Sequence, residues 1–395
     1  MKKPGTFDPG APAGAAAATL PAVHPASETT SQTEVALWAV IFAGGIGSRF
    51  WPLSTPDRPK PLLALVSEQT LIEDSIGRLQ PTIPPERVLI LTSRDIAPAI
   101  RSVTLDVPEQ NVLVEPRPLG SAAALAWAAS EIARRAGPSA VCCSIHADLA
   151  VDFPEQFREV LERTAALAAR EKALVSIGIT PTRPETGFGY VQPGAALEGE
   201  APLQRGGAFR VQEFVEKPGE TEASARIAAG ALWHSGIVVG QAGVFLQELA
   251  AHTEEVRDSL GLLAAGDVAA FTGGVRAISL ERGLLERTNR LLVVSAEFGW
   301  DDVGTWASLR RARELDDDGN GAIGPVHFVD SECNVVHSER GAVVLFGVSH
   351  LLVVVLDGIT FVTTLERSGD LKPLLDTLPG SMRLNPTSST NGPPR

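Results

Sequence analysis

A glycine-rich segment with two basic residues is the part of the sequence best suited to chemistry. Residues 43–49 read AGGIGSR, and Lys60 follows between two prolines. Glycines after a strand let backbone N–H groups approach phosphate oxygens closely. The fork of donors on Arg49 and the compact charge of Lys60 together suit a triphosphate. The segment therefore indicates a phosphate site, with an ordinary turn as the alternative interpretation of a bare Gly-x-Gly.

Two well-known phosphate motifs do not fit this segment. A Walker A loop requires Gly-Lys followed by Ser or Thr after four intervening residues, and that sequence is absent here. A dinucleotide fingerprint requires a third glycine at the position that Phe50 occupies. The phosphate site, if formed, must belong to another class of protein.

Two aspartates are candidates for holding a metal ion. Asp148 ends a His-Ala-Asp sequence after the apolar run 140–145, and Asp302 lies far along the chain beside Asp301. A carboxylate at the carboxyl end of a parallel strand lies in the crevice where α/β sheets bind ligands, although it can also cap the next helix. His146 could ligate a softer metal, but a single histidine without a partner motif favours a structural role.

The composition is that of an acidic soluble protein with a sizeable core. The chain has 395 residues, a formal net charge of −13 and 44% hydrophobic residues. This acidic balance argues against a general binder of nucleic acid or anionic membranes. The three cysteines are too few for a disulfide framework, and the adjacent Cys142 and Cys143 indicate buried thiols in a reducing compartment. The longest apolar run, 341–356, is shorter than the about 20 residues that span a membrane, so we expect a cytoplasmic protein.

Both ends of the chain have the composition of tails. Residues 1–34 are rich in Ala, Pro, Gly, Ser and Thr, with too few large apolar side chains to offset the entropy of ordering. A signal peptide is the alternative, because Lys2 and Lys3 precede an alanine-rich stretch, but prolines interrupt it and a Leu/Val-rich segment is missing. We predict disordered tails at 1–34 and 379–395.

Between these tails, apolar runs alternate with helical patterns. Strands are expected at 35–42, 87–91, 112–114, 140–145 and 173–179, and helices at 70–79, 96–105, 121–136 and 154–170. This alternation predicts βαβ units and a mostly parallel sheet. We therefore expect an α/β, Rossmann-like domain over residues 35–315.

After residue 315 the pattern changes to short β-branched runs. A turn-rich break at 316–321 precedes runs at 326–329, 334–336, 342–346, 351–355 and 360–364, and a helix is expected at 371–378. These runs predict a small all-β domain over 316–378, either a sandwich fragment or a short β-helix.

Five motifs, in this order, resemble those of the sugar-nucleotide pyrophosphorylases, and most closely the mannose-1-phosphate guanylyltransferases among them. They are AGGIGSRFWPLSTPDRPKP at 43–61, GITPTRPETGFGY at 178–190, FVEKP at 214–218, WHSGI at 233–237 and FGWDDVGTW at 298–306. The resemblance covers residues 35–378, including the β-rich region that such enzymes carry. It implies a nucleotidyltransferase domain followed by a short β-helix-like domain, and a homodimer.

The resemblance also implies roles for individual residues. Arg49 and Lys60 would neutralise phosphate charge, and Asp148 and Asp302 would hold Mg²⁺, which prefers carboxylates together with substrate phosphates. The implied nucleotide-binding residues are Ala43, Gly44, Gly45, Gly47, Ser48, Gly120 and Ser121, and the implied sugar-phosphate-binding residues are Gly189, Glu216, Lys217 and His234. Adjacent residues on a strand point to opposite faces, whereas the family's loop would turn both Glu216 and Lys217 toward the sugar.

The implied reaction transfers GMP from GTP to mannose 1-phosphate, giving GDP-mannose and pyrophosphate. In-line attack on the α-phosphate requires positioning and charge neutralisation rather than a covalent nucleophile. Three departures from the family pattern affect the expected specificity: the sequence LGSAAA at 119–124 in the loop that contacts the base, Leu149, and His234 in place of asparagine. A pyrophosphorylase for another nucleotide and sugar, and a non-catalytic sugar-nucleotide sensor, are the alternatives.

Overall fold

The computed structural model of the protein describes residues 36–45, 47–199, 206–311 and 315–384. The predicted tail at 1–34 lies outside these residues, and so does the stretch 385–395. Residues 35–395 group into one unit by their contacts, and the predicted division of this unit at residue 315 stays a prediction. Among the described residues, no helix combines the length and apolar character needed to cross a membrane.

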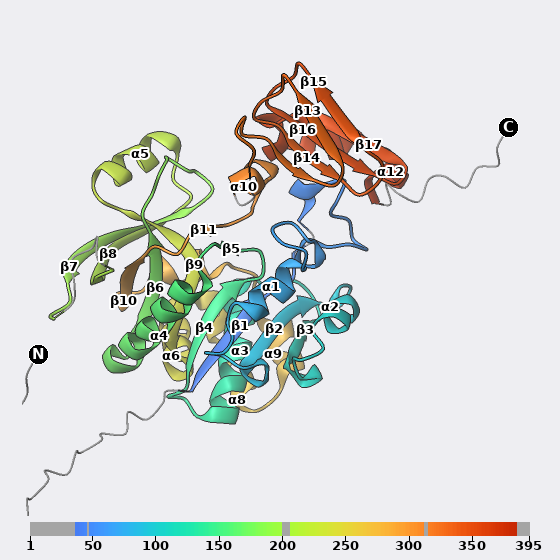
Figure 1. Cartoon of the computed structure of the whole chain (residues 1–395). Coiled ribbons are helices and arrows are strands. Elements are labelled where there is room, and N and C mark those ends of the chain that lie inside the picture. The colour runs from blue at the N-terminus through green and yellow to red at the C-terminus, as the bar shows by residue number, and fades with distance from the viewer. Residues whose placement is uncertain (1–35, 46, 200–205, 312–314, 385–395) are drawn as a thin grey trace, which may run out of the picture. The chain divides into compact units, whose positions relative to one another are not determined.

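A nine-stranded mixed sheet forms the centre of the region 36–311 (Figure 1). In spatial order its strands are β3 (Val112–Glu115), β2 (Val88–Ser93), β1 (Leu37–Phe42), β4 (Val141–His146), β9 (Leu232–Gln241), β6 (Leu174–Ile179), β10 (Leu291–Ala296), β8 (Ala208–Glu216) and β7 (Gly189–Ala196). Seven of these strands run in one direction, and β8 and β9 run in the other. The predicted mostly parallel sheet is confirmed, and the reversal places the start of β9 beside the carboxyl end of β6.

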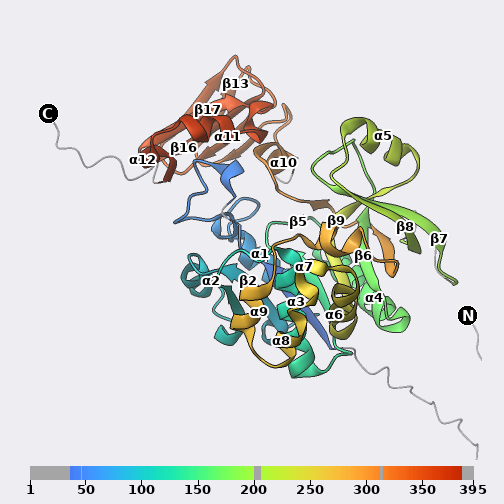
Figure 2. The same cartoon turned by 180° about the vertical axis from the view of Figure 1, so that it is seen from behind.

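Helices cover both faces of this sheet (Figures 1 and 2). The helices of this region are α1 (Leu71–Gly77), α2 (Ala97–Val103), α3 (Ser121–Ala136), α4 (Pro154–Glu171), α5 (Glu220–Ala228), α6 (Ala242–His252), α7 (Glu254–Arg257), α8 (Leu260–Ala264), α9 (Val268–Gly274) and α10 (Trp306–Arg311). Of these, α10 packs with the C-terminal strands and not on the sheet. Alternate residues of β1 enter different buried clusters, because successive side chains of a strand point to opposite faces. Trp38 and Val40 pack with α3 and α6, whereas Ala39 and Ile41 pack with α1, α2 and α4.

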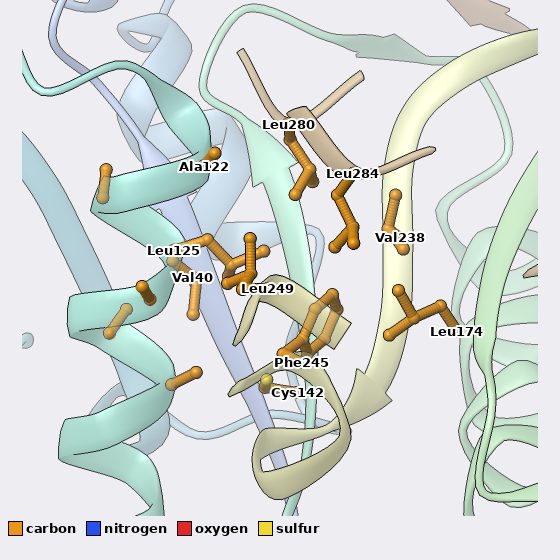
Figure 3. Packing of buried hydrophobic residues seen from close by; sticks show 14 of the residues in the cluster. Val40, Ala122, Leu125, Cys142, Leu174, Val238, Phe245, Leu249, Leu280 and Leu284 are labelled. Carbon is orange, nitrogen blue, oxygen red and sulfur yellow. The ribbon is translucent and has the colours of Figure 1, made fainter. Parts of the chain in front are cut away.

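Figure 3 shows the cluster between the sheet and the helices α3 and α6, where Val40, Leu125 and Phe245 meet. Cys142 is fully buried in this cluster, whereas Cys143 is fully buried on the other face of the sheet. Burial raises the pKa of both thiols, to about 12 for Cys143, so both stay protonated. The predicted burial of the two cysteines is confirmed, and their opposite orientations keep them from pairing with each other.

The region 321–364 forms parallel coils. Its strands are β12 (Gly321–Ile323), β13 (Val326–Val329), β14 (Val335–Ser338), β15 (Val343–Phe346), β16 (Leu351–Leu356) and β17 (Ile359–Thr364). The strands β12, β14 and β16 pair in parallel on one face, β13 and β15 pair in parallel on a second face, and β17 pairs antiparallel with β16. A chain that returns to the same face after each pair of strands is a short β-helix. Of the two predicted architectures, the short β-helix is therefore observed and the sandwich fragment is not.

Predicted and observed elements agree within two residues from β1 to β6, and the predicted helix at 371–378 is α11 (Lys372–Thr377). One boundary is wrong, because Gly380–Leu384 forms the helix α12 where the sequence analysis places a tail. The backbone carbonyl of Pro379 accepts hydrogen bonds from the N–H groups of Met382 and Arg383, which starts a new turn after α11. A proline favours such a first turn, since it has no N–H group to leave unpaired.

Buried asparagines link successive coils of the β-helix. The side-chain amide of Asn334 donates to Oδ1 of Asn320 and to the carbonyl oxygen of Val348, each at 3.0 Å. Its own Oδ1 accepts from the backbone N–H of Leu351 at 2.9 Å. The side chain of Asn334 therefore connects its own coil to the chain segments before and after it.

Replacing Asn334 by alanine should lower the free energy of unfolding by about 2–4 kcal/mol, because buried donors and acceptors lose their partner. Urea unfolding followed by circular dichroism measures this change. Thr360→Ala, at an exposed position of β17, is the matched control and should change stability by less than about 0.5 kcal/mol. Equal stabilities of the two variants would contradict the role assigned to Asn334.

Candidate active site

A two-part cleft lies where the loops after β1 and β4 meet the segment 298–306. Two adjoining cavities of about 610 and 1100 Å³ share five residues in their walls: Arg49, Ser121, His146, Asp148 and Asp302. We call the smaller cavity the glycine compartment, because Gly44, Gly45, Gly47 and Gly120 line it. We call the larger cavity the second compartment; it is lined by Gly189, Glu216, Lys217, His234 and Glu281, among other residues. The site lies at the carboxyl edge of the parallel strands, as expected for an open α/β sheet.

The predicted nucleotide-binding residues fall into one place, with one exception. Gly44, Gly45, Gly47, Ser48, Gly120 and Ser121 all line the glycine compartment. Ala43 does not line it, because its side chain is buried in the sheet core. Its backbone N–H donates to the carbonyl oxygen of Leu91, and its carbonyl oxygen accepts from the hydroxyl of Thr92. Ala43 thus anchors the start of the loop instead of contacting a ligand through its side chain.

Gly47 allows the loop to approach Lys60. Its φ is +75°, and a Cβ atom built at this position would lie 2.4 Å from the Cβ of Lys60. Any other residue would suffer both backbone strain and this overlap. The hydroxyl of Ser54 also donates to the carbonyl oxygen of Gly47, which holds the turn closed. The glycine pattern is therefore tied to the position of the lysine.

Lys60 is a nearly buried cation paired with Asp148. The residue is 6% exposed, and its Nζ lies 2.5 Å from Oδ2 of Asp148. The same Nζ lies 5.2 Å from the centroid of the Phe50 ring. Burial by itself would raise the pKa of Asp148, but the positive charge and the hydrogen bond of Lys60 outweigh it and lower this pKa. Asp148 is therefore a carboxylate in the cleft.

A short ladder brings Asp302 to the same cleft. The strand β11 (Trp300–Asp301) pairs antiparallel with β5 (Ala150–Val151), which directly follows the loop of Asp148. Asp302 lines both compartments, whereas Asp301 lines a separate cavity and forms an ion pair with Nε of Arg311 at 2.8 Å. The geometry thus separates the two neighbouring aspartates and turns Asp302 toward the site.

The two carboxylates fit a hard divalent cation. Burial, and then the charge of Asp301, raises the pKa of Asp302 to about 6. A positive ion beside Asp148 and Asp302 would relieve this unfavourable accumulation of negative charge. No cluster of three or more acidic, histidine or cysteine ligands occurs in the described residues. A cation held here would consequently need substrate oxygens to complete its shell, as Mg²⁺ commonly does.

Glu216 and Lys217 face the same cavity, contrary to the alternation of a regular strand. Glu216 is the last residue of β8, and Lys217 has a φ of +54°, which turns the chain. Their side chains form an ion pair of 2.7 Å, and both line the second compartment. Burial raises the pKa of Glu216, although the ammonium of Lys217 opposes this shift. The left-handed backbone at Lys217 turns both side chains into the second compartment, and the alternation of a strand does not predict this turn.

His234 lies at the start of β9, on the wall of the second compartment. Its Nδ1 lies 2.9 Å from the hydroxyl oxygen of Ser176, and the Phe214 ring meets its ring edge-on at 5.2 Å. Burial lowers the pKa of His234 to about 4, so the ring is neutral at physiological pH. A neutral histidine offers one donor and one acceptor, which suits a polar, uncharged ligand group.

Two further acidic residues of the cleft are not among those predicted from the sequence. Glu115 ends β3 and lines the glycine compartment, where burial raises its pKa to about 7. Its position at the carboxyl end of a predicted strand is the same signal that identified Asp148. Glu281 begins a short π-helix (Glu281–Leu285) and lines the second compartment. No local pattern in the sequence marks Glu281 as a cavity residue.

The fold and this cleft define a nucleotidyltransferase. The nucleotidyl transferase family model matches residues 38–319, and the chain belongs to this family of enzymes. It is 31% identical over 351 residues to the alginate biosynthesis protein AlgA of Pseudomonas putida, covering 86% of this chain and 71% of that protein. It is also 31% identical over 360 residues to a mannose-1-phosphate guanylyltransferase of Escherichia coli, covering 88% and 75% of the two chains.

A solved structure supports the same fold. The crystal structure of a Thermus thermophilus protein, described as a mannose-1-phosphate geranyltransferase, superimposes with a TM-score of 0.78 at 31% identity. The superposition covers 86% of this chain and 98% of the other. Both the α/β region and the β-rich C-terminal region therefore have a counterpart in a known structure, and the predicted fold class is confirmed.

Replacing Gly47 by alanine should reduce the kcat/KM of nucleotidyl transfer about 100-fold or more, because the added Cβ displaces Lys60 from its position. Pyrophosphate release measures this loss. Gly77→Ala is the matched control, since no atom lies within 4 Å of the added Cβ at this exposed end of α1. Near wild-type activity of Gly47→Ala would contradict the argument that the loop must contact Lys60.

Proposed function

We propose that the protein is a sugar-nucleotide pyrophosphorylase that transfers GMP from GTP to mannose 1-phosphate. The observation that carries the proposal is the two-part cleft, in which Arg49, Asp148 and Asp302 belong to both compartments. A nucleoside triphosphate in the glycine compartment and a sugar phosphate in the second compartment would meet at this shared wall. The name of the related Escherichia coli protein, a mannose-1-phosphate guanylyltransferase, supports the same reaction class.

The chemistry is an in-line displacement at the α-phosphorus. A phosphate oxygen of the sugar 1-phosphate forms the new P–O bond, the bond to the β-phosphate oxygen breaks, and pyrophosphate leaves with the electron pair. Arg49 and Lys60 would stabilise the negative charge that gathers on the phosphates, and Lys217 would bind the phosphate of the sugar. Because Lys60 is already buried against Asp148, its charge needs little reorganisation during the reaction.

Asp148 and Asp302 would hold Mg²⁺, which supplies charge neutralisation at the triphosphate when it is bound. Both residues line both compartments, so a cation between them would lie next to the phosphates of either substrate. Lys60 keeps Asp148 ionised and in place for this role. Arg311 engages Asp301 on the other side, which leaves Asp302 as the second ligand.

Glu115 supports guanine as the base. Its carboxylate lines the glycine compartment beside Gly44, where a Cβ would lie 3.8 Å from Oε2. Guanine presents an N–H and an amino group on one edge, and a carboxylate accepts from both. Gly120 and Ser121 line the same compartment, so Glu115 would add a carboxylate contact to the base beside this loop.

The test is pyrophosphate release by the purified chain over a grid of four nucleoside triphosphates and several hexose 1-phosphates. GTP with mannose 1-phosphate should give the highest kcat/KM, exceeding the other bases about tenfold or more. A different best pair would contradict the proposed substrates while keeping the reaction class. Absence of pyrophosphate release with every pair would favour a sugar-nucleotide sensor instead.

Replacing Asp302 by asparagine should lower kcat about 100-fold or more and raise the Mg²⁺ concentration needed for half-maximal rate, because a neutral amide is a weaker ligand. Asp301→Asn is the matched control on the neighbouring residue, and it should change kcat about fivefold or less, since it loses a partly exposed ion pair and relieves the repulsion that Asp302 experiences. The opposite ranking of these two variants would reverse the assignment of the metal ligand.

A further inference from the structure

His234 presents a buried nitrogen without a partner to the second compartment. Its side chain is 4% exposed, and Nε2 makes no hydrogen bond to any of the residues that the structure describes. A buried polar atom left unsatisfied costs about 1–3 kcal/mol, so native structures rarely keep one without a reason. At a cavity wall, that reason is a ligand atom that completes the hydrogen bond.

Ser176 determines which nitrogen of the His234 ring carries the proton. Its hydroxyl oxygen is fully buried on β6 and lies 2.9 Å from Nδ1. Within the described residues this is the sole hydrogen bond of the hydroxyl, so the serine must donate its proton to Nδ1 to be satisfied. The neutral ring then carries its own proton on Nε2. His234 therefore points an N–H donor at the cavity.

Glu281 provides an acceptor next to this donor. Its Oε1 lies 3.9 Å from Nε2 of His234, which is too long for a hydrogen bond, and both residues line the second compartment. An oxygen atom beside this pair, off the line that joins the two atoms, can lie about 2.8 Å from each. A single hydroxyl group on the cavity side can therefore contact both residues.

We propose that His234 and Glu281 form a hydroxyl clamp that recognises one hydroxyl group of the sugar phosphate. In this clamp His234 donates to the hydroxyl oxygen, and the hydroxyl donates its proton to Glu281. The inference rests on the proposed function, because it takes a sugar 1-phosphate as the ligand of the second compartment. It assigns to Glu281 a specificity-determining role that complements His234.

The chemistry of the clamp selects a hydroxyl over other polar groups. A phosphate oxygen accepts hydrogen bonds but donates none, and it would face the negative charge of Glu281. An ammonium donates but offers no acceptor to the Nε2–H of His234. The phosphate of the substrate must therefore lie elsewhere in the compartment, and Lys217, which is 55% exposed there, offers the positive charge for it.

The clamp divides its two hydrogen bonds between two residues. The neutral ring of His234 supplies a donor alone, because Ser176 occupies Nδ1. The acceptor then has to come from a second residue, and Glu281 is placed to provide it.

The test compares wild type and Glu281→Gln on mannose 1-phosphate and on analogues that lack one hydroxyl group at a time. For wild type, removal of the clamped hydroxyl should lower kcat/KM about 30-fold or more, since two buried groups lose their partner. For Glu281→Gln, kcat/KM on the parent sugar should fall about tenfold, because a neutral amide accepts a hydrogen bond more weakly than a carboxylate does. Loss of the same hydroxyl should then cost the variant about threefold, which is less than it costs wild type.

Controls separate this effect from a loss of structure. Glu222→Gln makes the same chemical change on the exposed surface of α5 and should keep the wild-type response to every analogue. His234→Ala should reproduce the loss of discrimination at the same hydroxyl as Glu281→Gln. Calorimetric binding of GTP verifies that each variant keeps the glycine compartment intact.

Two outcomes are distinguished by this design. If every analogue loses the same factor in Glu281→Gln as in wild type, the clamp does not exist, whatever the sugar. If wild type releases no pyrophosphate with any of the sugar 1-phosphates, the proposed function fails. In that case calorimetric binding of the same analogues still tests the clamp, and equal losses for wild type and Glu281→Gln overturn it.

Discussion

The enclosed charge of Lys60 is the constraint on which the cleft depends. An ammonium that is 6% exposed is tolerable only if an opposite charge compensates its lost hydration, and Asp148 supplies this charge at 2.5 Å. The pairing fixes the loop after β4 against the loop after β1. It also requires glycine at position 47, where a side chain would occupy the space of the lysine. Lys60, Asp148 and the glycine loop are thus held in place by their own contacts, without a ligand.

The β-helix packs against the loop that carries this lysine. Trp51 packs against Phe361 of β17 with ring centroids 5.3 Å apart. Phe50 packs at 5.2 Å against Trp306 of α10, which shares a buried cluster with Val335 and Leu352 of the coils. Arg58 forms an ion pair of 2.7 Å with Glu339 in the turn after β14. A hydrogen bond from His337, together with Arg58, lowers the pKa of Glu339 to about 2, so this carboxylate stays charged. The C-terminal coils are therefore part of the support of the active site, and not an independent attachment.

The charged side chains in the two compartments differ from the acidic balance of the whole chain. The chain has a net charge of −13, yet the walls of the glycine compartment carry Arg49 and Lys60. Within the second compartment, Glu216 is paired with Lys217, and Glu281 lies beside the neutral ring of His234. The overall acidic charge argues against polyanion binding, but it does not prevent a small anion from binding in one cleft.

The sequence by itself determined the elements of the first half of the chain, because long apolar runs and helical periods report directly on burial. The strands β7 to β10 were not predicted, since their places in the sheet depend on pairings between distant segments. The motifs identified the cleft residues, but not the exclusion of Ala43 from its walls. Only the tertiary structure turned Asp302 toward the site and Asp301 toward Arg311. Likewise, the left-handed backbone at Lys217 and the place of Glu281 opposite His234 follow from packing, because a linear pattern carries no information about which side chains meet across a cavity.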